Sequence, residues 1–139
     1  MFSGMSNHSI DSKGRIVLPA TFREELGETF YLVKGMGKCC IQAMSETEYE
    51  ARSKKISELP FNMSSALRYE FNGTAKSVTP NAQGRVILPL KLREISGIDD
   101  DALVVGMGDI IEIWNEKRFE EFMASQKDVI AEALSILRL

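Results

Sequence analysis

Apolar residues along the chain occur in short runs that predict strands and short helices in alternation. A strand ending near Ile10 is followed by polar residues 12–14 and by a β-branched run at residues 15–18, which predicts a tight hairpin with glycine in the left-handed position. Proline suits the first position of a helix, so we expect a short helix from Pro19 to Gly27. A second hairpin is predicted, with its strands at residues 30–33 and 39–44.

The same pattern returns in the second half of the chain. Residues 11–27 and 81–97 align at an offset of 70, and seven of these 17 positions are identical. A unit of this size buries its apolar face poorly alone, so we expect the two copies to pack together as a pseudo-dimer. The predicted domains are residues 1–71 and 72–139, each a repeat with a helical tail. The second copy has its predicted elements at residues 86–88, 89–96, 102–105 and 110–114.

The tail of the first copy carries two helix signals. Ser45 and Glu48 have the spacing of a capping box, which predicts a helix that ends near residue 57. Pro60 separates it from a second helix, for which we expect Asn62 to be the cap.

The tail of the second copy is also helical in pattern. Asn115 is expected to cap a first helix, and residues 129–137 carry a broad apolar face. Amphipathic tails either cover the strands or meet a neighbouring chain, and the pattern alone leaves both uses open. The predicted fold is mainly β with appended helices, which is α+β by content.

Composition excludes several classes of protein. The chain has 139 residues, of which 44% are hydrophobic and 27% charged, a globular balance. No apolar run approaches the length of a transmembrane helix, and the polar first 20 residues argue against a secretory leader. Cys39 and Cys40 are adjacent and His8 is the only histidine, so neither a metal site nor a disulfide framework is predicted.

We expect neither a catalytic site nor a cofactor. The sequence offers no pairing of a nucleophile with a base. The glycine turns at residues 35–37 and 106–108 lack the lysine and the following helix of a phosphate-binding loop, and they are typical of hairpin turns.

The distribution of charge matters more than its total. The net charge of −3 argues at first against a polyanionic partner. However, residues 1–23 and 81–98 each carry a net charge of +2, whereas residues 99–139 hold ten acids against four bases. The basic charge therefore lies on the repeated motif and the acidic charge on the C-terminal tail.

The loops at residues 11–15 and 81–85, named tip 1 and tip 2, carry the sharpest functional signal. A narrow β-ribbon fits the major groove, and an arginine at its end can bind phosphate or the O6/N7 edge of guanine. The candidate DNA-binding residues are Lys13, Arg15, Gln83 and Arg85.

The structural alternative is that Arg15 only pairs with Asp11 across the turn. In the second copy Asn81 replaces the aspartate, yet Arg85 is retained. Aspartate and asparagine can both bond the backbone two residues on, so we expect Asp11 and Asn81 to hold the turns and to leave the arginines free. The predicted turn-forming residues are Asp11, Gly14, Asn81 and Gly84.

Three further basic residues follow the tips on the short helices. Arg23, Lys91 and Arg93 are candidates for supporting DNA binding. For Arg23 and Arg93, support of the tip or pairing with glutamate is as reasonable as direct contact with DNA.

The run from Gly14 to Arg23, GRIVLPATFR, and its duplicate from Gly84 to Arg93 resemble the MraZ family of bacterial transcriptional regulators over essentially the whole chain. The resemblance implies two domains of the AbrB/MazE type, interlocked as a swapped-hairpin β-barrel, and a ring of about eight chains. It implies binding to repeated double-stranded DNA elements upstream of the division and cell-wall gene cluster that contains the family member's own gene. It also implies repression of that cluster and a cytoplasmic, nucleoid-associated location.

The family's DNA-binding tip corresponds here to Lys13, Arg15, Gln83 and Arg85. Tip 2 departs from the family's charged pattern, since it reads Asn-Ala-Gln, so we expect it to contribute less to affinity than tip 1. The alternative function is that of an antitoxin-like interaction module whose apolar and acidic tails bind a protein partner.

Overall fold

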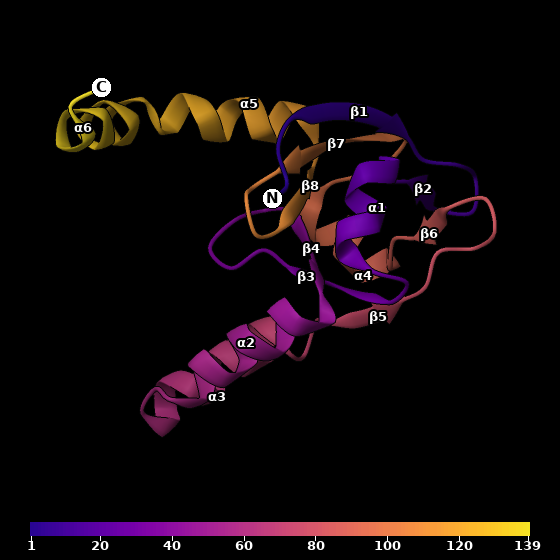
Figure 1. Cartoon of the computed structure of the whole chain (residues 1–139), viewed down its shortest axis with the longest axis horizontal. Helices are drawn as coiled ribbons and strands as arrows, with labels where there is room; N and C mark the ends of the chain where they lie inside the picture. Colours follow the sequence, from indigo (N-terminus) through magenta and orange to yellow (C-terminus); the bar gives the residue numbers. More distant parts are fainter.

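The computed structural model describes residues 1–139 as eight strands and six helices in two sheets (Figure 1). The strands are β1 (Met5–Ser9), β2 (Arg15–Val17), β3 (Phe30–Lys34), β4 (Ile41–Ser45), β5 (Lys76–Val78), β6 (Arg85–Ile87), β7 (Asp101–Gly106) and β8 (Ile111–Trp114). The helices are α1 (Ala20–Leu26), α2 (Glu46–Ser57), α3 (Phe61–Phe71), α4 (Leu90–Ser96), α5 (Glu116–Ser125) and α6 (Lys127–Leu137). The chain is 42% helical and 26% strand, so the mixed α+β content is confirmed, with more helix than "mainly β" suggests.

The two repeats are related by a pseudo-two-fold axis. The larger sheet has the order β1-β7-β8-β4-β3-β5, which reads the same from either end when repeat 1 and repeat 2 are exchanged. At the centre of this sheet Gln42 lies opposite Glu112, and in the two-stranded sheet Ile16 lies opposite Val86. Both pairs are 70 residues apart, so each residue faces its own repeat-mate across the axis.

Strands of one repeat pair with strands of the other. β1 pairs with β7, β5 pairs with β3, and β2 pairs with β6, all antiparallel. The hairpin ladder expected within residues 1–18 is therefore wrong: the loop itself closes, with Asp11 N donating to Arg15 O at 3.0 Å, but its flanking strands bond the other repeat. The strands are divided between a six-stranded and a two-stranded sheet.

One apolar core serves both repeats. Its largest cluster contains 17 buried residues drawn from both halves of the chain. The short helices contribute the side chains that follow each proline by a helical turn: α1 buries Phe22 and Leu26, and α4 buries Leu92. Neither repeat could bury this apolar surface alone, which agrees with the expectation that the two copies pack together as a pseudo-dimer.

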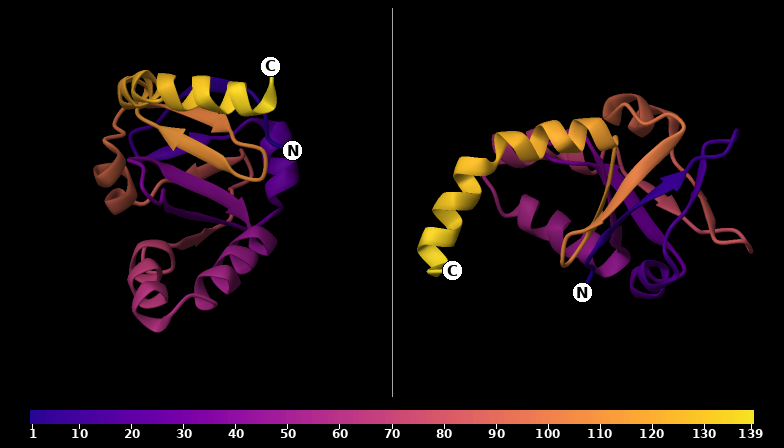
Figure 2. Two further views of the ribbon diagram at one scale, coloured as in Figure 1. Left: turned by 90° about the vertical axis from the view of Figure 1, so that its left-hand side faces the viewer. Right: turned by 90° about the horizontal axis from the view of Figure 1, so that it is seen from above.

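The tail helices project from the strand layers at the end opposite the tips (Figures 1 and 2). Tyr49 stacks on Tyr31 at 3.9 Å between ring centroids and thereby fixes α2 to β3. Phe119 and Phe122 pack on Trp114 and fix the start of α5 to β8. Beyond these contacts α5 and α6 bury no residue, so the second tail does not cover the strands.

The helix caps agree with the sequence except in one place. The hydroxyl of Ser45 accepts from the backbone N–H of Glu48, and the side chain of Asn115 accepts from that of Arg118. The expected cap at Asn62 is wrong: α3 begins at Phe61, directly after Pro60, whose fixed φ already sets the first turn. None of the six helices is long and apolar enough to cross a membrane.

Replacing Ile16 by alanine is expected to lower the free energy of unfolding by about 2–5 kcal/mol, because this buried side chain packs at the pseudo-two-fold axis. Ile87→Ala, on the outward face of the partner strand and 60% exposed, is the matched control and should change it by no more than about 0.5 kcal/mol. Denaturant unfolding at one protein concentration measures both. Equal losses would contradict the assigned inward and outward faces of the ribbon.

Candidate nucleic-acid interface

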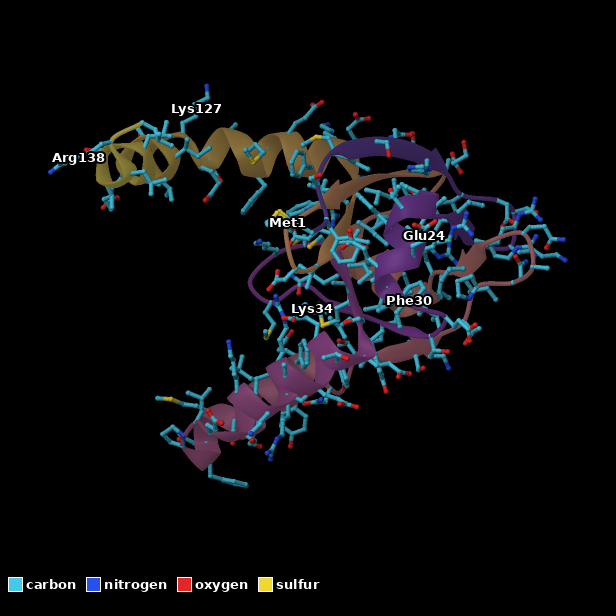
Figure 3. All side chains as sticks on the ribbon, viewed as in Figure 1. Met1, Glu24, Phe30, Lys34, Lys127 and Arg138 are labelled. Carbon is cyan, nitrogen blue, oxygen red and sulfur yellow. The ribbon has the colours of Figure 1, made fainter.

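Tip 1 and tip 2 lie together at one end of the molecule, opposite the tail helices (Figure 1). Tip 1 leads into β2 and tip 2 leads into β6. Because β2 pairs with β6, the two tips are held near each other. Figure 3 shows side chains ending in nitrogen on both loops. The structure therefore brings together the residues of two motifs that are 70 positions apart in the chain.

Asp11 organises tip 1. Its Oδ1 accepts from the backbone N–H groups of Lys13 and Arg15, each at 2.9 Å, and its Oδ2 accepts from Arg15 Nε at 2.7 Å. Asp11 therefore bonds the backbone two and four residues on, the bonding typical of an aspartate in a turn. The expectation that Arg15 is free is wrong, because the carboxylate has a second oxygen that faces the guanidinium; the Nη groups of Arg15 donate to no protein acceptor.

Tip 2 has the same backbone and a different side-chain state. Asn81 Oδ1 accepts from the backbone N–H groups of Gln83 at 3.0 Å and Arg85 at 2.9 Å. The side chain of Arg85 is exposed and has no protein partner. Each tip carries a net charge of +1, tip 1 through two bases and one acid and tip 2 through Arg85 alone.

Hydrogen bonding lowers the pKa of the Asp11 carboxyl below its ordinary value. The backbone N–H of Arg15 is the largest cause, the Arg15 guanidinium and the N–H of Lys13 act in the same direction, and desolvation opposes them. Asp11 therefore stays ionised and paired throughout the neutral range.

The outward face of the β2–β6 ribbon carries both arginines. Ile16 and Val86 point into the core, so the alternation along each short strand places Arg15 and Arg85 outward. Two hollows, of about 400 and 230 Å³, flank the ribbon, and each is lined by both arginines.

Sequence reasoning missed two apolar positions on this face. Val17 and Ile87 are exposed beside the arginines. The signal that could have found them is the period-two alternation around the buried Ile16 and Val86.

The three helix residues differ in their surroundings. Arg23 Nε donates to Leu18 O and Arg93 Nε donates to Leu88 O, each at 3.1 Å, and neither arginine pairs with a carboxylate. Pairing of these arginines with glutamate is therefore not observed. Lys91 is exposed on α4 and forms no ion pair.

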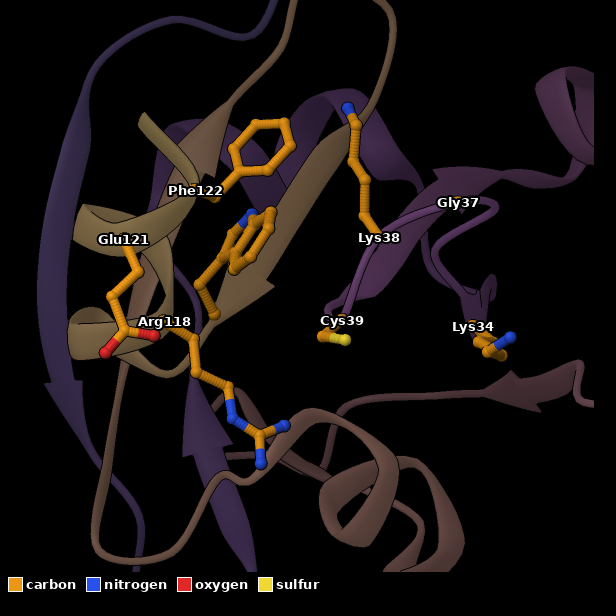
Figure 4. Close-up of a pocket in the computed structure, with 8 residues that line it drawn as sticks. Lys34, Gly37, Lys38, Cys39, Arg118, Glu121 and Phe122 are labelled. Carbon is orange, nitrogen blue, oxygen red and sulfur yellow. The ribbon is translucent and has the colours of Figure 1, made fainter. Parts of the chain in front are cut away.

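A second concave site lies away from the tips, between the β3–β4 loop and α5, with a volume of about 590 Å³ (Figure 4). Three cations line it, but Lys38 pairs with the buried Glu112 and Lys34 with Glu70. These carboxylates offset the charges of the two lysines. No group of three or more His, Cys, Asp or Glu side chains in the chain could hold a metal ion.

Fold and site together define a duplicated, interlocked domain that presents two arginine-bearing loops at one end. The family model described as "MraZ protein, putative antitoxin-like" matches the chain twice, at residues 1–72 and 71–135. The chain belongs to the MraZ family.

Named relatives match it over nearly its whole length. The protein named transcriptional regulator MraZ from Syntrophomonas wolfei subsp. wolfei is 41% identical over 125 residues, which is 88% of this chain and 86% of the relative. Proteins of the same name are 39% identical in Pelotomaculum thermopropionicum, over 100% of this chain and 99% of the relative, and 35% identical in Acetivibrio thermocellus, over 99% of each.

The carboxyl of Asp11 is expected to titrate with a midpoint below 3.8, its ordinary value. A pKa lowered by folding stabilises the folded state above the unfolded value, and this stabilisation is lost as the pH falls through the folded pKa. The stability advantage of the wild type over Asp11→Asn, whose amide does not titrate, should therefore shrink below about pH 4. NMR of the side-chain carboxyl carbon measures the midpoint, and a value at or above 3.8 would contradict the hydrogen-bonded turn.

Proposed function

We propose that this protein is a sequence-specific DNA-binding transcriptional regulator that contacts DNA through tip 1 and tip 2. The observation that carries the proposal is the convergence of Arg15 and Arg85, from two repeats, on one outward ribbon face. Two guanidinium groups with free Nη donors suit phosphate oxygens and guanine edges.

The residues on and around the ribbon face are suited to different contacts with DNA. Arg15 and Arg85 bind phosphate or guanine, while Lys13 and Gln83, exposed at the tips, add contacts to phosphate or base edges. Exposed Val17 and Ile87 are suited to thymine methyl groups. Arg23, Lys91 and Arg93 support this surface from the helices behind it.

The charge map supports the same orientation on DNA. The tips and the short helices that follow them are basic, since residues 1–23 and 81–98 each carry a net charge of +2. The acidic charge lies mainly at residues 99–115, with a net charge of −5, and not on the C-terminal tail as expected, since residues 116–139 carry only −1. A polyanion is attracted to the basic end of the molecule. The total of −3 therefore does not argue against DNA.

We further propose a ring of about eight chains joined through the tail helices. Phe61, Tyr69 and Ile136 are 80%, 78% and 76% exposed on α3 and α6, which is costly for an isolated chain in water. Several tip pairs on one ring would bind repeated DNA elements with an avidity that one pair lacks. The swapped-hairpin arrangement and the domain boundary between residues 71 and 72 are part of this proposal.

The proposed target is the repeated DNA upstream of the division and cell-wall gene cluster that contains this protein's own gene, and the proposed effect is repression. Support comes from membership of the family, whose relatives are named transcriptional regulators. Such a protein acts on chromosomal DNA, so we propose that it is found at the nucleoid.

A second candidate function is an interaction module. The exposed apolar residues of α3 and α6 favour it, and the family description contains the term antitoxin-like. In that case the tails hold a protein partner and the tips are structural loops.

Arg15→Ala and Arg85→Ala are each expected to weaken binding of the upstream DNA by about 5- to 150-fold, the range for a specific arginine contact. Arg15→Ala should have the larger effect, because Asp11 already holds Arg15 in place, whereas ordering Arg85 on binding costs entropy. Fluorescence anisotropy measures both. The slope of log affinity against log salt concentration should become shallower by about one for each phosphate contact that is lost with an arginine at a bound tip.

Lys54→Ala, at an exposed position on α2, is the matched control and should bind like the wild type, because α2 carries none of the exposed apolar residues through which the ring is proposed to form. Wild-type affinity in both tip variants, with assembly unchanged in sedimentation, would contradict the proposal. A protein partner that co-purifies with such variants in the absence of DNA binding would favour the interaction module.

A further inference from the structure

Arg23 and Arg93 each cover the tip of the other repeat. A Cβ built on Gly14 of tip 1 would lie 2.9 Å from Arg93 Nη2, and one built on Gly84 of tip 2 would lie 2.6 Å from Arg23 Nη1. Arg93 belongs to repeat 2 and Arg23 to repeat 1, so both contacts cross the pseudo-two-fold axis. The same crossed contact, formed twice by independent residues, is a feature of the interlocked fold.

Each arginine is aimed by its own repeat. Arg23 Nε donates to Leu18 O and Arg93 Nε to Leu88 O, the carbonyl just before the proline that starts the short helix. With no carboxylate partner, this backbone carbonyl sets the direction of each side chain. The flat guanidinium is thereby held against the opposite tip.

The tip glycines depend on this cover. Gly14 and Gly84 have φ of +75° and +77°, and both are buried although most neighbouring tip residues are exposed. A side chain at either position would be strained by φ and would also displace the arginine.

Tip 1 has one further bond to the other repeat, besides the cover by Arg93. Leu88 N donates to Gly14 O at 2.9 Å. Leu88 therefore bonds tip 1 directly through its N–H, and its carbonyl oxygen accepts from the Arg93 side chain that covers the same tip. The equivalent bond from Leu18 to Gly84 is not formed. Tip 1 is therefore held from the other repeat by both backbone and side chain, and tip 2 by side chain alone.

We propose that Arg93 is the positioning residue for tip 1 and Arg23 the positioning residue for tip 2, so that the DNA affinity of each tip is set by a helix of the other repeat. This inference rests on the proposed DNA-binding function for its consequence, but its geometry concerns the free protein. The positioned groups are Arg15 and Arg85, each of which directly follows a covered glycine.

The crossed contact separates positioning from simple charge. An arginine that only attracts phosphate adds the same increment whichever tip is intact. A positioning arginine loses its effect when the residue that it positions is already gone. Removal of Arg93 should therefore matter little in an Arg15→Gln background and fully in an Arg85→Gln background.

The first test is hydrogen–deuterium exchange of the free, full-length protein, with peptides that resolve the two tips. Arg93→Gln should speed exchange of the amides at residues 13–15 at least about threefold and leave residues 83–85 unchanged; Arg23→Gln should do the reverse. Arg68→Gln is the control and should change neither tip. Faster exchange in the variant's own repeat, or in neither tip, would overturn the proposal.

The second test is a set of double-mutant cycles in DNA affinity. Two double variants combine a positioning arginine with the arginine that it positions: Arg93→Gln with Arg15→Gln, and Arg23→Gln with Arg85→Gln. In each, the loss of DNA affinity should differ from the product of the two single losses by at least about threefold. In the two other combinations the single losses should multiply within about twofold. Arg93→Lys should rescue neither exchange nor affinity, since an ammonium cannot keep the Nε bond and also cover Gly14. Full rescue by lysine, or four multiplicative combinations, would overturn the proposal.

The two tests separate the claims. Crossed exchange effects in a protein that binds no DNA would support the positioning role and contradict the proposed function. Loss of DNA binding in Arg15→Gln without crossed exchange effects would support the function and overturn the positioning role.

Discussion

The antiparallel pairing of Ile16 with Val86 is the constraint on which the rest of the structure depends. Both side chains are buried, and the pair lies on the axis that relates the two repeats. A three-residue strand cannot stand alone, so each repeat needs the other to complete its ribbon. The same pairing that closes the core places Arg15 and Arg85 on a single outward face. Stability and presentation of the tips therefore have one physical origin.

This interlock divides the molecule into two ends of different chemistry. The tips and the short helices behind them carry basic groups with free donors, whereas α5 and α6 carry apolar groups that the chain itself does not bury. Duplication within one chain has also let the halves diverge: Asp11 holds Arg15 in place, and Asn81 leaves Arg85 free. Two similar loops thus carry one paired guanidinium and one that has no protein partner.

Local signals predicted most of the elements, and long-range geometry explains what was missed. The cap at Ser45 was predictable because it depends on neighbouring residues, whereas no local pattern indicates that residues 15–17 pair with residues 85–87 instead of forming a hairpin. At the site, the turn role of Asp11 followed from its type and spacing. Its grip on Arg15 depends on the rotamers of both side chains, which the sequence does not determine. The crossed covers of the tip glycines depend on how the repeats pack, so they could be seen only in the structure.

The most direct test maps which end of the molecule faces DNA. An iron chelate that cleaves nearby DNA is attached at Ser12→Cys, Ala82→Cys or, as the control, Ser57→Cys at the end of α2, in a Cys39→Ser background. Cys40 remains, because it is buried and desolvation raises the pKa of its thiol far above neutral, which keeps it unreactive. The account predicts cleavage of the upstream DNA from positions 12 and 82, at adjacent sites, and none from position 57. Cleavage from position 57 alone would contradict it.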